Sequence, residues 1–100
     1  MRLLKVENMR SSSGRSVPNQ FIINMDTSGS YFSETFQSYS SAIARKVYDR
    51  KRNRTQIVLD KNYWDYSVTT GKYRNQFLGE GIAETRKKIK SGEYKLVDLN

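Results

Sequence analysis

Hydrophobic and polar residues follow the patterns of β-strands in several short runs within the first sixty positions of the chain. Residues 19–25 are nearly continuously apolar, as in a buried strand, and residues 31–39 alternate, as in a half-buried one. Between them lie the small polar residues 27–30, whose composition favours a turn. The pattern therefore predicts a β-hairpin over residues 19–39.

A second pair of runs, residues 42–49 and 55–60, flanks the polar residues 50–54. Each run places apolar side chains on alternate positions, so that one face of the strand can enter a core. We expect a second hairpin with a charged tip over residues 42–61. A helix over residues 40–50 is the alternative, because Ser40 or Ser41 could act as its N-cap.

The first eighteen residues carry less hydrophobic pattern. Residues 1–6 alternate weakly and are compatible with a short edge strand. Residues 7–18 contain four serines, one glycine and two arginines but only two apolar side chains. That composition predicts a flexible Ser-rich loop or arm over residues 7–18.

From residue 67 onward the hydrophobic period becomes helical. Ser67 or Thr69 can cap a first helix, which the glycines at positions 79 and 81 would end. Ile82 and Ile89 recur at helical spacing in a second helix, and Gly92 marks its end. Residues 94–99 alternate again and predict a last strand.

The order of these elements, strands first and helices after, predicts the fold class. We expect one α+β domain over residues 1–100, in which a small antiparallel β-sheet packs with one or two C-terminal helices. The sheet would consist of the two hairpins plus edge strands. The chain has 100 residues, which allows one hydrophobic core.

Residue types that the chain lacks exclude several classes of function. There is no cysteine and no histidine, which removes thiolate and imidazole metal ligands, a cysteine nucleophile and the commonest general base near neutral pH. The acidic residues are few and scattered. We therefore expect no enzyme, no metal and no cofactor. No apolar run resembles a membrane span or a secretory signal, so we expect a cytoplasmic protein with no membrane partner.

The formal net charge of +8 lies almost entirely in the second half of the chain. Residues 1–44 carry four positive and three negative side chains, whereas residues 45–100 carry fourteen positive and seven negative ones. The positive electrostatic field of such a segment attracts polyanions and speeds their encounter with the protein. A nucleic acid is the expected partner, with DNA and RNA undecided.

The densest basic segment is the predicted tip of the second hairpin. Its members are Arg45, Lys46, Arg50, Lys51, Arg52 and Arg54, which we predict to contact phosphates. Lys72 and Arg74 are a predicted second phosphate contact. The alternative for the tip is a solvated turn whose charges keep the hairpin from pairing edge to edge.

An aromatic cluster offers a different kind of contact. Tyr63 and Tyr66 could stack on unpaired bases or anchor a protein partner, whereas Trp64 is interpreted as a core residue. The nearby Gly71-Lys72 pair superficially resembles a phosphate-binding loop. That loop requires an earlier glycine where Tyr66 stands and a Ser or Thr after the lysine, where the chain has a tyrosine. A nucleotide hydrolase is therefore not expected.

Residues 36–39 read FQSY, with Ile43 and Ala44 after them, and residues 62–80 read NYWDYSVTTGKYRNQFLGE. The segment SGEYKL follows at residues 91–96, with four further residues after it. With these segments the chain resembles a family of small uncharacterised proteins of bacteriophages and related mobile elements, over roughly residues 19–99. The resemblance implies a bacterial host cell as the setting and carries no functional residue. It also adds alternatives to nucleic-acid binding: an inhibitor or adaptor of a host protein, such as an anti-CRISPR or other anti-defence protein, or a minor virion component. Oligomeric state is not predicted.

Overall fold

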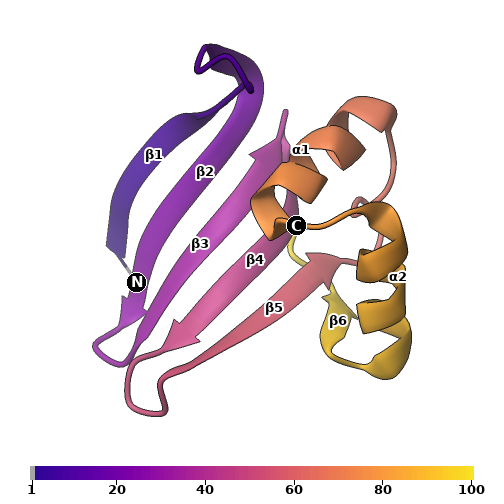
Figure 1. The fold of residues 1–100 in the computed structure, drawn as a ribbon. Helices are drawn as coiled ribbons and strands as arrows, with labels where there is room; N and C mark the ends of the chain where they lie inside the picture. The colour runs from indigo at the N-terminus through magenta and orange to yellow at the C-terminus, as the bar shows by residue number, and fades with distance from the viewer. Residues whose placement is uncertain (1) are drawn as a thin grey trace.

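The computed structural model describes residues 2–100, apart from the side chains of residues 27 and 28. The elements in chain order are β1 (Arg2–Arg10), β2 (Ser16–Ser28), β3 (Tyr31–Ser38), β4 (Ser41–Asp49), β5 (Arg54–Asp60), α1 (Val68–Leu78), α2 (Ile82–Ser91) and β6 (Tyr94–Val97). The six strands form one sheet in the order β1-β2-β3-β4-β5-β6 (Figure 1). Each of the strands β1 to β5 runs antiparallel to its neighbour. β6 pairs parallel to β5, because α1 and α2 carry the chain back toward the end of the sheet from which β5 starts. The predicted α+β class is confirmed.

Both predicted hairpins are present. β2 pairs with β3, with Ile22 opposite Phe36, and β4 pairs with β5, with Lys46 opposite Ile57. The helical alternative for residues 40–50 is wrong. β4 lies between β3 and β5, so both of its edges find backbone partners, and these outweigh the capping potential of the serines at its start.

The predicted loop over residues 7–18 is largely wrong. β1 continues to Arg10 and β2 begins at Ser16, so that only residues 11–15 form a turn. Ser11 N donates to Arg15 O at 2.8 Å and closes this turn. The sequence misleads here because β1 is an edge strand with mostly exposed side chains. Its pairing with β2 depends on backbone hydrogen bonds, which a hydrophobic pattern does not reveal.

The two helices are capped as the sequence predicts. The Ser67 side chain accepts a hydrogen bond from Thr70 N at 3.1 Å, and Gly79 ends α1 in the left-handed conformation with a φ of 72°. Gly92 ends α2 in the same way. Ser38 Oγ and Thr70 Oγ1 lie 2.9 Å apart in a buried hydrogen bond that joins β3 to α1.

The helices pack against one face of the sheet at one end, which divides the sheet into two surfaces (Figure 1). The helix face carries Phe36, Ser38, Ala44, Lys46, Ile57 and Leu59 in the central strands. The open face carries Ser33, Thr35, Arg45, Val47, Gln56 and Val58. The core lies between the helix face and α1, where the Phe36 and Phe77 rings are 5.9 Å apart. No helix in residues 2–100 is both long and apolar enough to cross a membrane.

Candidate nucleic-acid interface

The β4–β5 turn is held in shape by its own polar groups. Asp49 Oδ1 accepts hydrogen bonds from Lys51 N at 3.1 Å and from Arg52 N at 3.2 Å. Tyr48 Oη donates to Asn53 Oδ1, and Asn53 adopts a positive φ of 51°. These hydrogen bonds fix the backbone of the turn from which the basic side chains extend.

Two of the turn's arginines have acidic neighbours. Arg50 lies 3.5 Å from Asp26 and donates to Gly29 O at 3.2 Å, which ties this turn to the neighbouring β2–β3 turn. Arg52 lies 3.8 Å from Asp49. Within residues 2–100, Lys51 and Arg54 form no ion pair, and both are exposed. These two cations are therefore available to an external anion, although Asp49 stands opposite Arg54 in the sheet.

The structure separates the other two predicted members of the tip. Arg45 lies on the open face, where its Nε donates to Thr35 Oγ1 at 2.8 Å. Lys46 lies on the helix face, where its ammonium donates to Phe77 O at 2.8 Å and sits 4.4 Å above the centre of the Phe77 ring. It is also 3.8 Å from Glu34. Lys46 thus joins β4 to α1, and we do not retain it as a phosphate contact.

The predicted phosphate contact by Arg74 is wrong. Its side chain is only 2 % exposed, and its guanidinium donates to Trp64 O and Asp65 Oδ1, both at 2.9 Å, and to Asn75 Oδ1 at 3.0 Å. A buried arginine with these partners cannot reach a polyanion. Lys72 is exposed, but Figure 1 places α1 at the end of the sheet opposite the β4–β5 turn. The structure therefore does not bring Lys72 to the tip.

The aromatic cluster also lies away from the tip. Tyr63 and Tyr66 are partly exposed and pack edge to face, with ring centres 5.5 Å apart. Trp64 is partly buried against the core and lies 5.4 Å from the Arg74 guanidinium, in agreement with a structural role. The prediction that Tyr63 and Tyr66 contact a base or a partner stays a prediction.

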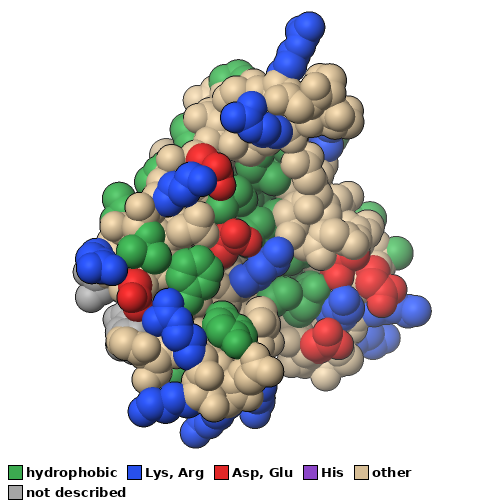
Figure 2. Space-filling view, turned by 60° about the vertical axis from the view of Figure 1, so that its left-hand side comes forward, with side chains coloured by type: hydrophobic (Ala, Val, Ile, Leu, Met, Phe, Trp, Pro, Cys, Tyr) green, Lys and Arg blue, Asp and Glu red, His purple; other side chains and the backbone are tan. Residues whose placement is uncertain are grey.

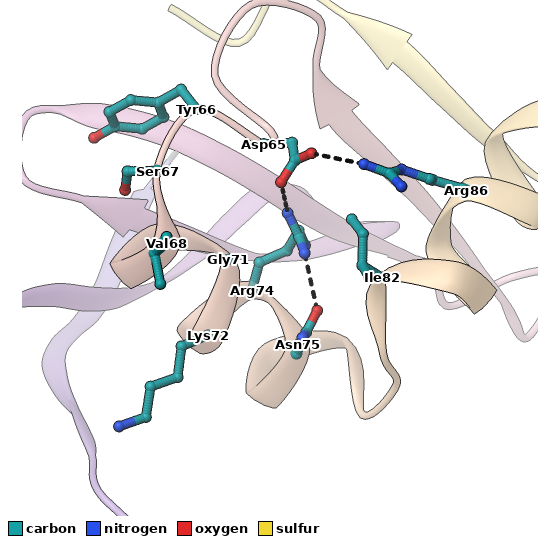
Figure 3. A pocket seen from close by; sticks show the side chains of 10 residues that line it. All are labelled: Asp65, Tyr66, Ser67, Val68, Gly71, Lys72, Arg74, Asn75, Ile82 and Arg86. Carbon is teal, nitrogen blue, oxygen red and sulfur yellow. Dashed lines mark hydrogen bonds and ion pairs between the residues drawn. The ribbon is translucent and has the colours of Figure 1, made fainter.

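A groove of about 650 Å³ lies between the start of α1 and the start of α2. At its base Asp65 accepts from Arg74 at 2.9 Å and from Arg86 at 3.4 Å (Figure 3). Lys72 extends away from this triad. The single carboxylate offsets only one of the two guanidinium charges, but both guanidinium groups already donate to it, which reduces their attraction for a phosphate.

The two faces of the sheet differ in charge balance. On the helix face, Lys5 pairs with Glu7, Lys46 with Glu34 and Arg50 with Asp26, and acidic and basic side chains lie side by side in Figure 2. The open face carries Arg45, Arg54 and Lys95. Among its described strand residues, the only acidic side chain with solvent exposure is Asp49. Uncompensated positive charge therefore lies on the open face and at the adjoining turn.

A small cavity on the open face, beside the β4–β5 turn, was not predicted. It is lined by Tyr31, Val47, Asp49, Arg52, Arg54 and Gln56. The alternating pattern of residues 31–39 places Tyr31 and Ser33 on one side of a strand. It does not show which strand lies beside them, and this neighbour determines the cavity.

The buried carboxylates of the chain serve the fold. Burial alone would raise the pKa of Asp60, but hydrogen bonds from the backbone N–H groups of Leu99, Asn62 and Tyr63 outweigh it and lower that pKa. Glu80 has a lowered pKa for the same reason, through the side chains of Lys88, Thr85 and Tyr94. No three acidic, histidine or cysteine side chains in residues 2–100 lie together as metal ligands would.

Comparison with known proteins places the chain in a family without assigning an activity. The profile of a family of unknown function, DUF8033, matches residues 4–94. The chain therefore belongs to this family. No significant match was found among curated proteins or among solved structures.

Proposed function

We propose that this member of the DUF8033 family binds nucleic acid, without catalysing a reaction, through the β4–β5 turn and the adjoining open face. The observation that supports this function most directly is the pair Lys51 and Arg54, exposed and without an acidic partner in residues 2–100, on a turn fixed by Asp49. Arg50 and Arg52 lie in the same turn, Arg50 with Asp26 and Gly29 O as partners and Arg52 with Asp49, and Arg45 lies farther along the open face with Thr35 as its partner. Binding of this kind releases counterions and weakens with salt.

The proposed setting is the cytoplasm of a bacterial host cell, with a bacteriophage or mobile element as the source. It derives from the resemblance of residues 64–80 to phage proteins. DNA and RNA are both compatible with phosphate contacts, because these contacts carry no sequence information.

The test is fluorescence anisotropy of labelled single-stranded DNA, duplex DNA and RNA, measured at several salt concentrations. We expect affinity to fall linearly on a log–log plot against salt. The double variant K51Q/R54Q should lower the steepness of that slope by about 1.4 for a single strand, since each lost phosphate contact removes about 0.7. Wild-type protein that binds none of the three probes even at low salt would refute the proposed function.

A matched control removes the same charge elsewhere. Lys87 and Lys90 lie exposed on α2, and K87Q/K90Q changes the net charge as K51Q/R54Q does. If the turn is the contact surface, K87Q/K90Q should keep a slope close to that of the wild type. Equal slopes for the two variants would show that overall charge, and not the turn, governs binding.

A second candidate function, binding of a host protein as an inhibitor or adaptor, is favoured by the outer edge of the sheet. Leu3 and Val6 of β1 are 57 % and 52 % exposed, and the backbone at this edge has no neighbouring strand in residues 2–100. An edge of this kind can accept a strand from another protein. A pull-down from bacterial lysate with and without nuclease separates the two functions. A partner retained after nuclease treatment and lost in L3K/V6K would support the second.

A further inference from the structure

The cavity on the open face combines an aromatic ring with basic side chains in one place. Three strands build it in two cross-strand rows: Tyr31, Asp49 and Arg54 stand opposite one another in the first, and Val47 and Gln56 stand opposite one another in the second. Residues directly opposite in an antiparallel sheet share a face. The cavity is thus a product of strand register, and its members come from three segments of the chain.

We propose that this cavity holds one unpaired base of a single-stranded nucleic acid, stacked on the ring of Tyr31. This binding mode rests on the proposed function and specifies its ligand. Tyr31 is 39 % exposed, so part of its ring is available to a flat partner. Stacking on aromatic side chains is how proteins hold unpaired bases without requiring a particular sequence.

The size of the cavity favours one ring system over a whole small molecule. Its volume is about 120 Å³. Sites for drug-sized ligands enclose roughly 300–1000 Å³. Val47 lines the cavity together with Tyr31 and supplies an apolar contact beside the ring. A base that enters this space would exchange water for contact with Tyr31 and Val47.

The charges around the cavity determine how a strand would lie. Asp49 repels phosphate, but its Oδ1 already accepts two hydrogen bonds from the turn, and its side chain is 15 % exposed. Arg52 and Arg54 line the same cavity, and Lys51 lies at the adjoining turn. The base would therefore stack on Tyr31, and the phosphates on either side of it would contact the basic side chains. Gln56 offers one donor and one acceptor to the edge of the base.

This arrangement requires a single strand. A base within a duplex is paired and stacked, and extruding it costs a few kcal/mol. Phosphate contacts alone would favour the duplex, which has the higher charge density. A preference for single strands would therefore be due to stacking and not to charge.

The experiment compares Tyr31→Ala with Tyr39→Ala, which removes an exposed tyrosine at the β3–β4 turn, beyond the opposite end of the strand that begins with Tyr31. The probes are fluorescein-labelled oligodeoxythymidylate, an abasic strand of the same length and a duplex. We expect Tyr31→Ala to bind the normal strand about 5- to 150-fold more weakly than the wild type, at an unchanged salt slope. Tyr31→Phe, which keeps the ring, should bind like the wild type, and so should Tyr39→Ala.

The abasic strand separates stacking from a general disturbance of the fold. It keeps the phosphates and lacks the bases, so Tyr31→Ala and wild type should bind it equally. If Tyr31→Ala weakened the abasic and normal strands by the same factor, the base-stacking role would be overturned. Salt-dependent binding that is insensitive to Tyr31→Ala would refute base binding in the cavity while leaving the proposed function intact. Absence of any wild-type binding would instead refute both.

Discussion

Arg74 provides the sharpest test of the structure, because the sequence suggests a ligand contact and the structure shows a buried anchor. Its guanidinium donates hydrogen bonds to Trp64 O, Asp65 and Asn75 and lies 5.4 Å from the Trp64 ring centre. These contacts join the segment before α1 to the helix itself. Arg74→Met would fill much of the same space and remove every one of these polar contacts.

The expected loss in the free energy of unfolding depends on the polar groups that Arg74→Met leaves without a partner. Removing one partner of a buried ion pair costs about 3–5 kcal/mol. The Asp65 side chain is 36 % exposed, so water and Arg86 can partly replace the lost partner. The Trp64 carbonyl accepts a hydrogen bond from no other side chain in residues 2–100. We therefore expect Arg74→Met to lower the free energy of unfolding by about 3 kcal/mol, a large share of the roughly 5–15 kcal/mol of a small domain.

The assay is urea unfolding followed by far-UV circular dichroism. Arg86→Met is the control, because Arg86 pairs with the same carboxylate at 3.4 Å but has a side chain that is 63 % exposed. An exposed pair contributes about 0–1 kcal/mol, so this control should unfold close to the wild type. Arg74→Lys keeps the charge and loses the planar fork, and it should recover only part of the stability. If Arg74→Met unfolded within 1 kcal/mol of the wild type, the assignment of Arg74 as an anchor would be refuted.

Two further predictions concern pH and backbone conformation. Because the pKa of Asp60 is lowered in the folded protein, its contribution to stability is present above its unfolded pKa of about 3.9 and is lost as pH falls through the folded value. Thermal unfolding between pH 7 and pH 2 should therefore show a steeper loss for the wild type than for Asp60→Asn, which should be less stable at pH 7; parallel profiles would contradict this. Gly79→Ala should cost roughly 1–2 kcal/mol in urea unfolding, since Gly79 has a φ of 72° and an added Cβ would meet no atom. Gly29→Ala also meets open space but has no positive φ, and an equal loss there would exclude backbone strain as the cause.

Local signals in the sequence predict most of the elements. The hydrophobic patterns give both hairpins, and Ser67, Gly79 and Gly92 give the limits of the helices, because capping depends on the backbone within a few residues. The length of β1 was missed, since an edge strand can pair through its backbone while its side chains stay polar. The dense basic turn was also evident, because its residues are adjacent in the chain.

The sequence by itself therefore determined the fold class, the order of the elements and the basic turn, all of which depend on neighbours in the chain. Only the tertiary structure decided which basic side chains remain accessible. It buried Arg74, joined Lys46 to α1 and placed Lys72 at the other end of the sheet. It also brought Tyr31 beside Arg54 through the register of three strands. Burial and strand register depend on contacts between distant segments, and a periodic pattern within one segment carries no information about them.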